Sequence, residues 1–256
     1  MNLSASTAAR VGAFFDIDGT LLPPPSLEWR FLAFLLAHDD IGSINLARWL
    51  GRFLRLAAVS PHVAATENKV HLRDLPESLA DMWQRSLFCH AARPGNPPAG
   101  FSIFAEALTR MEWHVSRGHR IFLVSGTLAP LARIVASHLS QEFSVPIECR
   151  ATEIASRHST WTGELAGPHI SGKEKARTIA ELAACHTLSL ADSFAYANGF
   201  SDLPALAAVG HPVMVNPSHR LAHAAATLHW PVVRWSSPPA ARGVSFSVSA
   251  RIEGAS

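Results

Sequence analysis

Cysteine is scarce in this chain of 256 residues. The three cysteines, Cys89, Cys149 and Cys185, are odd in number and widely spaced, and no C-x-x-C pair occurs. A disulfide framework is therefore disfavoured, and we expect the protein in the reducing environment of the cytoplasm. The pairs Cys89-His90 and Cys185-His186 do not have the ligand spacing of a zinc site.

Long apolar runs and a strong charge imbalance are also missing. The longest apolar stretch, Phe31 to Ala37, is too short to span a bilayer, so we expect no integral membrane segment. Residues 1–10 contain no apolar core of a signal peptide. The formal net charge is +2 and no Lys/Arg run stands out, so a nucleic-acid partner is not expected. Hydrophobic residues make up 48%, which indicates a globular chain with one large domain or a core domain carrying an insertion.

The first chemical signal is an apolar run, Val11 to Phe15, that leads directly into Asp16-Ile-Asp18-Gly19. Such a run is typical of a buried strand in a parallel sheet, and residues i and i+2 of a strand share a face. Ligands of open α/β sheets bind at the carboxyl ends of strands. Two carboxylates there favour a cation site, a nucleophile with an acid/base partner, or both. An ordinary Asp-rich turn is the alternative; an EF-hand is excluded, because its loop would place Leu27 where a glutamate is required.

Helical periodicity then replaces the strand pattern. After the connector at 23–26, apolar residues recur every three or four positions from Leu27 to about Arg93, where a second Pro-rich connector begins. We therefore predict an α/β core domain at 1–22 and 94–235, a helical insertion at 23–93, and a flexible tail at 236–256. The basic amphipathic stretch from Asn45 to Leu56 allows membrane-surface binding, but packing within the insertion is the favoured interpretation.

Strand-then-helix units resume after the insertion. The run from His119 to Thr127 predicts a buried strand that ends in Ser125-Gly126-Thr127, with a helix starting at once. The N-terminus of a helix that follows a strand can bind phosphate, because its unpaired backbone N–H groups and the helix dipole favour an anion. The alternative is that Ser125 only caps the helix. Further strands are predicted before Asn198 and over 213–217, and a hairpin strand over 160–165. Repeated units of this kind predict a parallel sheet.

The segment Gly172-Lys173-Glu174-Lys175 heads another predicted helix. It almost matches a P-loop, but Glu174 stands where a hydroxyl must bind magnesium and no strand runs straight into the glycine. A P-loop is therefore excluded. The lysines remain available to an anion.

Together these segments resemble the haloacid dehalogenase (HAD)-like phosphohydrolases, and specifically the phosphoserine-phosphatase-like branch, subfamily IB. The resemblance covers about residues 11 to 230. Four motifs occur in the family's order: Phe-Asp16-Ile-Asp18-Gly-Thr-Leu, Leu-Val-Ser125-Gly-Thr, Gly172-Lys-Glu-Lys175 and Asn198-Gly-Phe-Ser-Asp202-Leu-Pro. The resemblance implies a Rossmann-like parallel sheet core with a helical cap inserted after the first strand.

The resemblance also implies the chemistry of the site. Asp16 would form an aspartyl-phosphate, and Asp18 would act as the acid and then the base. Ser125 would hold a phosphoryl oxygen and Lys175 would neutralise charge, with Lys173 as its runner-up. The implied substrate-binding residues are Ser125, Gly126, Thr127, Lys175 and Glu28, and the implied Mg²⁺ ligands are Asp16, Asp18 (through its backbone carbonyl), Asn198 and Asp202.

One departure from the family concerns Asn198, where an aspartate is usual. Asparagine can offer its carbonyl oxygen to a metal ion but carries no negative charge. Its presence is compatible with an active enzyme and also with an enzyme of weakened activity.

The predicted function is that of a magnesium-dependent phosphomonoester hydrolase acting on a small phosphorylated metabolite. The alternatives are a phosphatase of lipid-derived phosphates, a phosphoserine phosphatase, and a degenerate, non-catalytic binding module. The Trp- and Leu-rich insertion favours the first alternative. Against the second, Pro25 and Ser26 stand where a substrate-reading glutamate is expected, and Glu28 comes slightly later. Nothing in the sequence predicts an oligomeric state.

Overall fold

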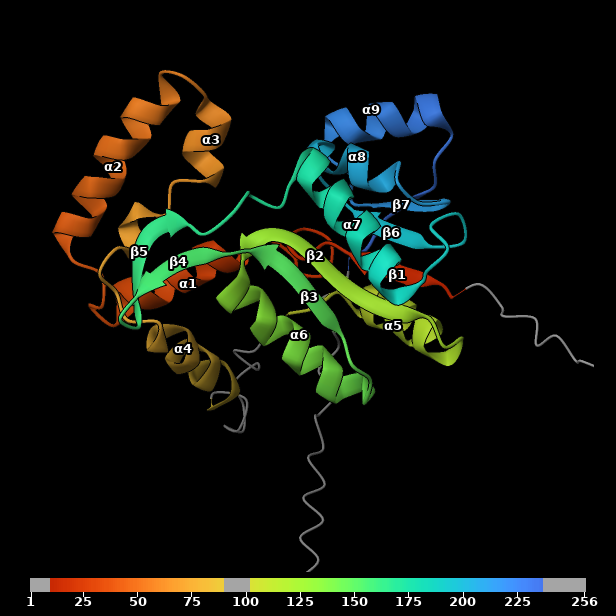
Figure 1. The fold of residues 1–256 in the computed structure, drawn as a ribbon, viewed down its shortest axis with the longest axis horizontal. Helices are drawn as coiled ribbons and strands as arrows, with labels where there is room; N and C mark the ends of the chain where they lie inside the picture. Colours follow the sequence, from red (N-terminus) through yellow and green to blue (C-terminus); the bar gives the residue numbers. More distant parts are fainter. Residues whose placement is uncertain (1–9, 90–101, 237–256) are drawn as a thin grey trace, which may run out of the picture.

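The computed structural model describes residues 10–89 and 102–236. Within these residues, six parallel strands form one sheet in the order β3-β2-β1-β6-β7-β8 (Figure 1). The strands are β1 (Gly12–Phe15), β2 (Arg120–Leu128), β3 (Glu148–Thr152), β6 (Phe194–Ala197), β7 (His211–Val215) and β8 (Val232–Val233). The predicted α/β class with a parallel sheet is confirmed.

Both faces of the sheet are covered by helices. In β1, Ala13 and Phe15 belong to one core cluster while Phe14 belongs to another, because successive strand residues point to opposite faces. The first cluster includes apolar residues of α5 (Ala105–Ser116) and α6 (Ala129–Phe143). The second includes residues of α7 (Gly172–His186), α8 (Leu203–Leu206) and α9 (His219–Leu228). Burial on both faces explains why the central strands β1 and β6 are continuously apolar.

The strand order reverses its direction at β1. The chain runs from β1 outward through β2 and β3, and then crosses back to β6 on the other side of β1. The backbone N–H of Asp16 donates to the carbonyl of Tyr196 at 2.9 Å, which joins the ends of β1 and β6. Ligands of open α/β sheets bind at such a switch point, outside the carboxyl ends of the strands. The fold therefore brings the ends of β1, β2 and β6 to one place.

The predicted helical insertion forms between β1 and β2. It comprises α1 (Leu27–Ala37), α2 (Ser43–Ala57), α3 (Pro61–Thr66), the 3₁₀ turn η1 (Val70–Leu72) and α4 (Ser78–Cys89). The side chain of Ser26 accepts from the N–H of Trp29 and caps α1, so the first Pro-rich connector ends at a helix start. The second connector at 93–98 and the tail beyond residue 236 lie outside the described residues.

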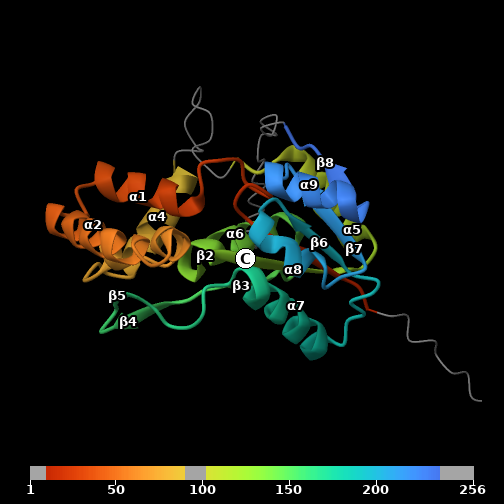
Figure 2. The same cartoon turned by 90° about the horizontal axis from the view of Figure 1, so that it is seen from above.

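A hairpin from far along the chain packs on this insertion. Strands β4 (Ile154–Arg157) and β5 (Thr160–Leu165) are antiparallel, as predicted for residues 160–165. Trp161 exchanges backbone hydrogen bonds with Asp74 and Leu75, and Arg52 pairs with Glu164. From above, the hairpin lies beside α1, α2 and α4, at the end of the molecule away from α7 and α9 (Figure 2). No sequence pattern predicted this association.

The apolar face of α2 is only partly covered. Asn45 is buried, and its Nδ2 donates to the carbonyls of His71 and Arg73 at 3.0 and 2.9 Å. By contrast, Leu46, Leu50 and Leu54 are exposed by 38%, 51% and 63%. Packing within the insertion therefore accounts for only part of this amphipathic helix. Across residues 10–89 and 102–236, no helix combines the length and the apolar character needed to cross a membrane.

Candidate active site

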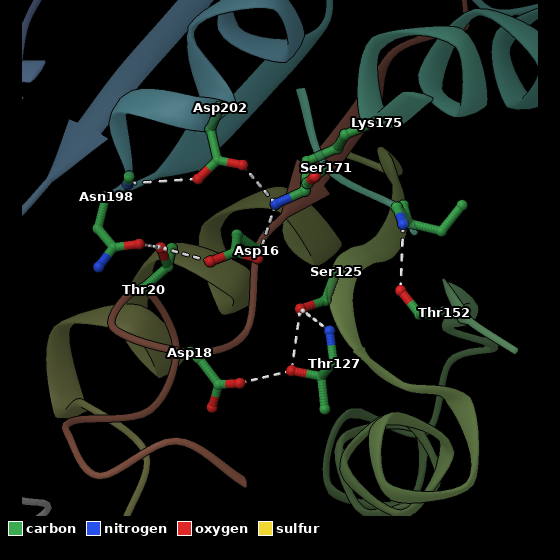
Figure 3. A network of polar contacts seen from close by, with 12 residues as sticks. Asp16, Asp18, Thr20, Ser125, Thr127, Thr152, Ser171, Lys175, Asn198 and Asp202 are labelled. Atoms are coloured by element: carbon green, nitrogen blue, oxygen red, sulfur yellow. Dashed lines mark hydrogen bonds and ion pairs between the residues drawn. The ribbon is translucent and has the colours of Figure 1, made fainter. Parts of the chain in front are cut away.

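A cavity of about 420 Å³ opens at the carboxyl ends of β1, β2 and β6 and extends towards the helical insertion. Its floor contains the sequence-predicted residues Asp16, Asp18, Ser125, Lys175, Asn198 and Asp202. They come from four separate stretches of the chain and point towards one another (Figure 3). The structure thus brings the four motifs together at one site.

Lys175 joins two buried carboxylates. It lies in the first turn of α7, and its Nζ is 2.8 Å from Asp16 Oδ1 and 2.6 Å from Asp202 Oδ1 (Figure 3). Burial raises the pKa of Asp16 to about 6, against the opposing effect of Lys175. Burial also disfavours the charge on Lys175, but Asp16 and Asp202 outweigh it and raise the pKa of the lysine. Lys175 is therefore a fixed cation beside the Asp16 carboxylate.

Asp202 is fully engaged by the protein. Its Oδ1 contacts Lys175, and its Oδ2 accepts the backbone N–H of Gly199 at 3.3 Å. A role as a metal ligand would require one of these oxygens to be shared with the ion. The geometry assigns Asp202 first of all to the positioning of Lys175.

Asp18 holds together three parts of the molecule. Its Oδ1 accepts the N–H of Leu27, the first residue of α1, at 2.8 Å, and its Oδ2 accepts the hydroxyl of Thr127. Burial raises the pKa of Asp18, although these two hydrogen bonds act in the opposite direction. A raised pKa favours the protonated carboxyl group that a general acid requires.

The Ser125-Gly126-Thr127 segment lies within the last part of β2, at a shift in its register with β3. The N-cap position of α6 is Leu128, so the alternative in which Ser125 caps this helix is wrong. Instead the Ser125 hydroxyl donates to Thr127 Oγ1 and accepts the N–H of Thr127, both at 3.3 Å. All three residues of the segment line the cavity, where a ligand can contact them.

Glu28 lines the cavity, as predicted, but both its oxygens are engaged. One forms an ion pair with Lys69, and the other accepts the N–H of Leu128 at 3.3 Å. Burial raises the pKa of Glu28, against the effect of Lys69. The sequence reasoning missed Lys69, which is 3% exposed, because a lone lysine in a helical stretch carries no distinguishing signal.

Thr20 links Asp16 to Asn198. Its Oγ1 lies 3.3 Å from Asp16 Oδ2, to which it donates, and 3.5 Å from Asn198 Oδ1 (Figure 3). Gly19 has a positive φ of 79°, and a Cβ at this position would lie 2.0 Å from Asn198 Nδ2. The turn after β1 therefore requires glycine, both for its conformation and for the close approach of Asn198.

These oxygens fit a hard cation. Asp16 Oδ2 and Asn198 Oδ1 face the same hydroxyl, and Mg²⁺ is usually held by one or two carboxylates together with water and substrate phosphate. Among the described residues, no three His, Cys, Asp or Glu side chains are grouped as a metal site. The sparse oxygen set is the kind that magnesium accepts.

His169 is a further cavity residue that the sequence reasoning missed. Its Nδ1 lies 3.0 Å from Ser171 Oγ, and a Cβ added to Gly126 would come within 3.0 Å of its ring. Burial lowers the pKa of His169 to about 4, so the ring is neutral at pH 7. The available signal was its position just before the Gly172–Lys175 motif.

Comparison with known proteins identifies the family. The haloacid dehalogenase-like hydrolases match residues 13–207, which is most of the chain, and the protein therefore belongs to this family. A Mycobacterium tuberculosis protein named as a probable phosphatase is 30% identical over 243 residues, covering 91% of this chain and 78% of that protein. A phosphoserine phosphatase of the same species is 30% identical over 125 residues, covering 49% of this chain and 38% of its own.

A solved structure has the same fold. A protein of unknown function from Bordetella pertussis Tohama I superposes with a TM-score of 0.67 at 26% identity, covering 88% of this chain and 99% of that one. The predicted family, the Rossmann-like α/β fold and the enzyme class, a phosphatase, are confirmed.

Proposed function

We propose that this protein is a magnesium-dependent phosphomonoesterase that hydrolyses a small phosphorylated substrate through an aspartyl-phosphate on Asp16. The observation that carries the proposal is the buried Asp16–Lys175–Asp202 group at the floor of a cavity at the switch point. Family membership supports the reaction class. The cysteine pattern favours the cytoplasm as the compartment.

The first step transfers the phosphoryl group. A carboxylate oxygen of Asp16, held in place by Lys175, attacks phosphorus, and the bond from phosphorus to the ester oxygen breaks. Asp18 gives its proton to the departing oxygen, and burial, which raises its pKa, favours the protonated form.

The second step regenerates the enzyme. Asp18, now a carboxylate, takes a proton from a water that attacks the phosphorus of the aspartyl-phosphate. Cleavage of the bond between phosphorus and Asp16 oxygen releases inorganic phosphate and leaves Asp16 ionised again. Thr127 and Leu27 keep the Asp18 carboxyl in place through both steps.

Charge on the phosphoryl oxygens needs fixed positive partners. Lys175 provides a cation, and Ser125, Gly126 and Thr127 line the cavity with hydroxyl and N–H donors. Bound Mg²⁺ would neutralise further negative charge and orient the phosphoryl group. Asp16, the backbone carbonyl of Asp18, Asn198 and Asp202 would hold the ion. Asn198 contributes an oxygen without adding charge.

The test is magnesium-dependent release of p-nitrophenol from p-nitrophenyl phosphate. Asp16→Asn is nearly isosteric but lacks the nucleophile, so turnover should fall by several orders of magnitude. Asp192→Asn is the matched control, because Asp192 is exposed and does not line the cavity. The proposal would be refuted if Asp16→Asn retained activity within tenfold of the parent. It would also be refuted if the parent bound phosphate without any turnover, which is the behaviour of a non-catalytic binding module.

Asp18→Asn separates the two steps. The first step can proceed with the good p-nitrophenolate leaving group, whereas hydrolysis of the aspartyl-phosphate should stall. Rapid mixing should therefore show a burst of about one equivalent of product followed by slow turnover. A steady state as fast as that of the parent would remove Asp18 from the acid/base role.

A further inference from the structure

One wall of the cavity is apolar, in contrast to its floor and to the polar residues His62, Thr66, Asn68 and His71 that also line it. Trp29 and Leu32 from α1 and Leu46 and Trp49 from α2 form this wall, and we call these four residues the apolar wall. Trp29 is 64% exposed and Leu46 is 38% exposed. Large apolar side chains that line a ligand cavity gain free energy when an apolar group covers them.

The charged groups of the cavity already have partners. Among the lysines and arginines of the described chain, Lys69 and Lys175 line the cavity, and each contacts at least one carboxylate. Both oxygens of Glu28 are also engaged. A zwitterionic leaving group such as serine would have to break the Lys69–Glu28 pair to form an ion pair with either of these residues; two other polar atoms on the cavity wall, Asn68 Oδ1 and His71 Nδ1, belong to neutral side chains. Breaking such a pair is strongly unfavourable.

We propose that the alcohol part of the substrate is uncharged and apolar, and that it binds against the apolar wall between α1 and α2. This inference rests on the proposed phosphomonoesterase function and narrows its substrate class. It places lipid-like or aromatic phosphomonoesters ahead of phosphoserine.

The experiment uses n-alkyl monophosphates from ethyl to octyl. Their leaving alcohols have similar basicity, so kcat/KM along the series reports contact with the cavity and not the chemistry. Each methylene that becomes buried should raise kcat/KM about fourfold. The parent should prefer butyl phosphate to O-phosphoserine. Alkylphosphonates of the same lengths, which cannot be hydrolysed, should show the same trend in Kd by calorimetry.

Matched variants locate the effect on α2. Leu46→Ala and Trp49→Ala should flatten the dependence of kcat/KM and of phosphonate Kd on chain length. Leu54→Ala is the control: Leu54 is 63% exposed on the same helix, two turns beyond Leu46, and does not line the cavity. Equal flattening by Leu54→Ala would show that the apolar wall is wrongly placed.

The two readouts distinguish the two proposals. If turnover is seen but both kcat/KM and phosphonate Kd are independent of chain length, or O-phosphoserine is preferred, the apolar substrate class is wrong and the phosphatase function stands. If phosphonate affinity rises with chain length but no phosphomonoester is hydrolysed, the apolar site stands and the proposed function fails. Because the Kd series needs only the parent protein, misfolding of a variant leaves the inference testable.

Discussion

Removal of the Lys175 charge tests whether the buried ion network organises the site. Lys175→Met keeps the length and apolar character of the side chain but removes its ammonium group. Lys175, Asp16 and Asp202 have side chains exposed by only 6%, 8% and 6%, so solvent replaces little of the lost interaction. The two carboxylates would then face each other without the cation that lies between them.

The expected loss of folding stability in Lys175→Met can be worked out in two independent ways. Each charge-assisted hydrogen bond contributes about 1.5–3 kcal/mol, and Lys175 makes two of them. Breaking a buried ion pair by removing one partner costs about 3–5 kcal/mol, which agrees. For a chain of this size, about 1 kcal/mol shifts Tm by roughly 2–4 °C, so Tm should fall by roughly 6–20 °C at pH 8.

The assay is thermal unfolding followed by circular dichroism in EDTA, with phosphatase activity measured in parallel with magnesium. Lys173→Met is the control, because Lys173 is exposed on the same first turn of α7. Lys175→Met should lose activity by at least about a hundredfold, since an electrostatic contact of this kind contributes about 2.7–4 kcal/mol to catalysis. Adding Asp202→Asn to Lys175→Met should recover part of the stability but not the activity.

A small change in the Tm of Lys175→Met would contradict the role given to Lys175 in the buried ion network. If Lys175→Met melted within 2 °C of Lys173→Met, a threshold at the lower edge of about 2–4 °C per kcal/mol, Lys175 would not be the cation that compensates the buried carboxylates. If Lys175→Met stayed fully active while Lys173→Met did not, the runner-up lysine would be the functional one.

Two further changes address the metal and the pH dependence. Asn198→Asp should lower the half-saturating magnesium concentration about tenfold, because the added charge strengthens binding by roughly 1–2 kcal/mol. Asn198→Leu should abolish both the metal-dependent activity and the magnesium-induced rise in Tm. Full activity of the leucine variant at low magnesium would show that Asn198 is not a metal ligand. Burial lowers the pKa of His114 from 6.5 to about 3. Between these two pH values the unfolded chain binds a proton at His114 and the folded protein does not. The free energy of unfolding should therefore fall as the pH drops from 6.5 towards 3. His114→Gln should remove up to about 1.36 kcal/mol per pH unit of this slope, measured as urea unfolding free energy between pH 4 and 6; an unchanged slope would contradict the assignment.

Local patterns were sufficient for the central strands, the helices of the insertion and the motif residues. The apolar run before Asp16 predicted β1, and the run ending at Thr127 predicted β2, because a strand buried on both faces must be continuously apolar. In the insertion, apolar residues recur every three or four positions, which places them on one face of a helix. This spacing predicted the helices. The spacing of Asp16 and Asp18 placed two carboxylates at one strand end, and the structure puts both at the cavity floor.

Partnerships between distant segments were not predictable in this way. The hairpin at 154–165 packs on the insertion, Glu28 pairs with Lys69, and Asp202 holds Lys175. Such contacts depend on how the chain crosses between strands and on which charges are buried together. No local period or spacing records either of these.

The sequence by itself determined the class of fold, the family and the residues from which the site is built, since each is written in short apolar runs and motifs. Only the tertiary structure decided the state of those residues. It showed that Asp202 and Glu28 are already engaged, that Ser125 does not cap a helix, and that the cavity extends to an apolar wall on α1 and α2. The physical reason is that hydrogen-bond partners, burial and cavity shape belong to residues brought together by folding, whereas the motifs belong to residues adjacent in the chain.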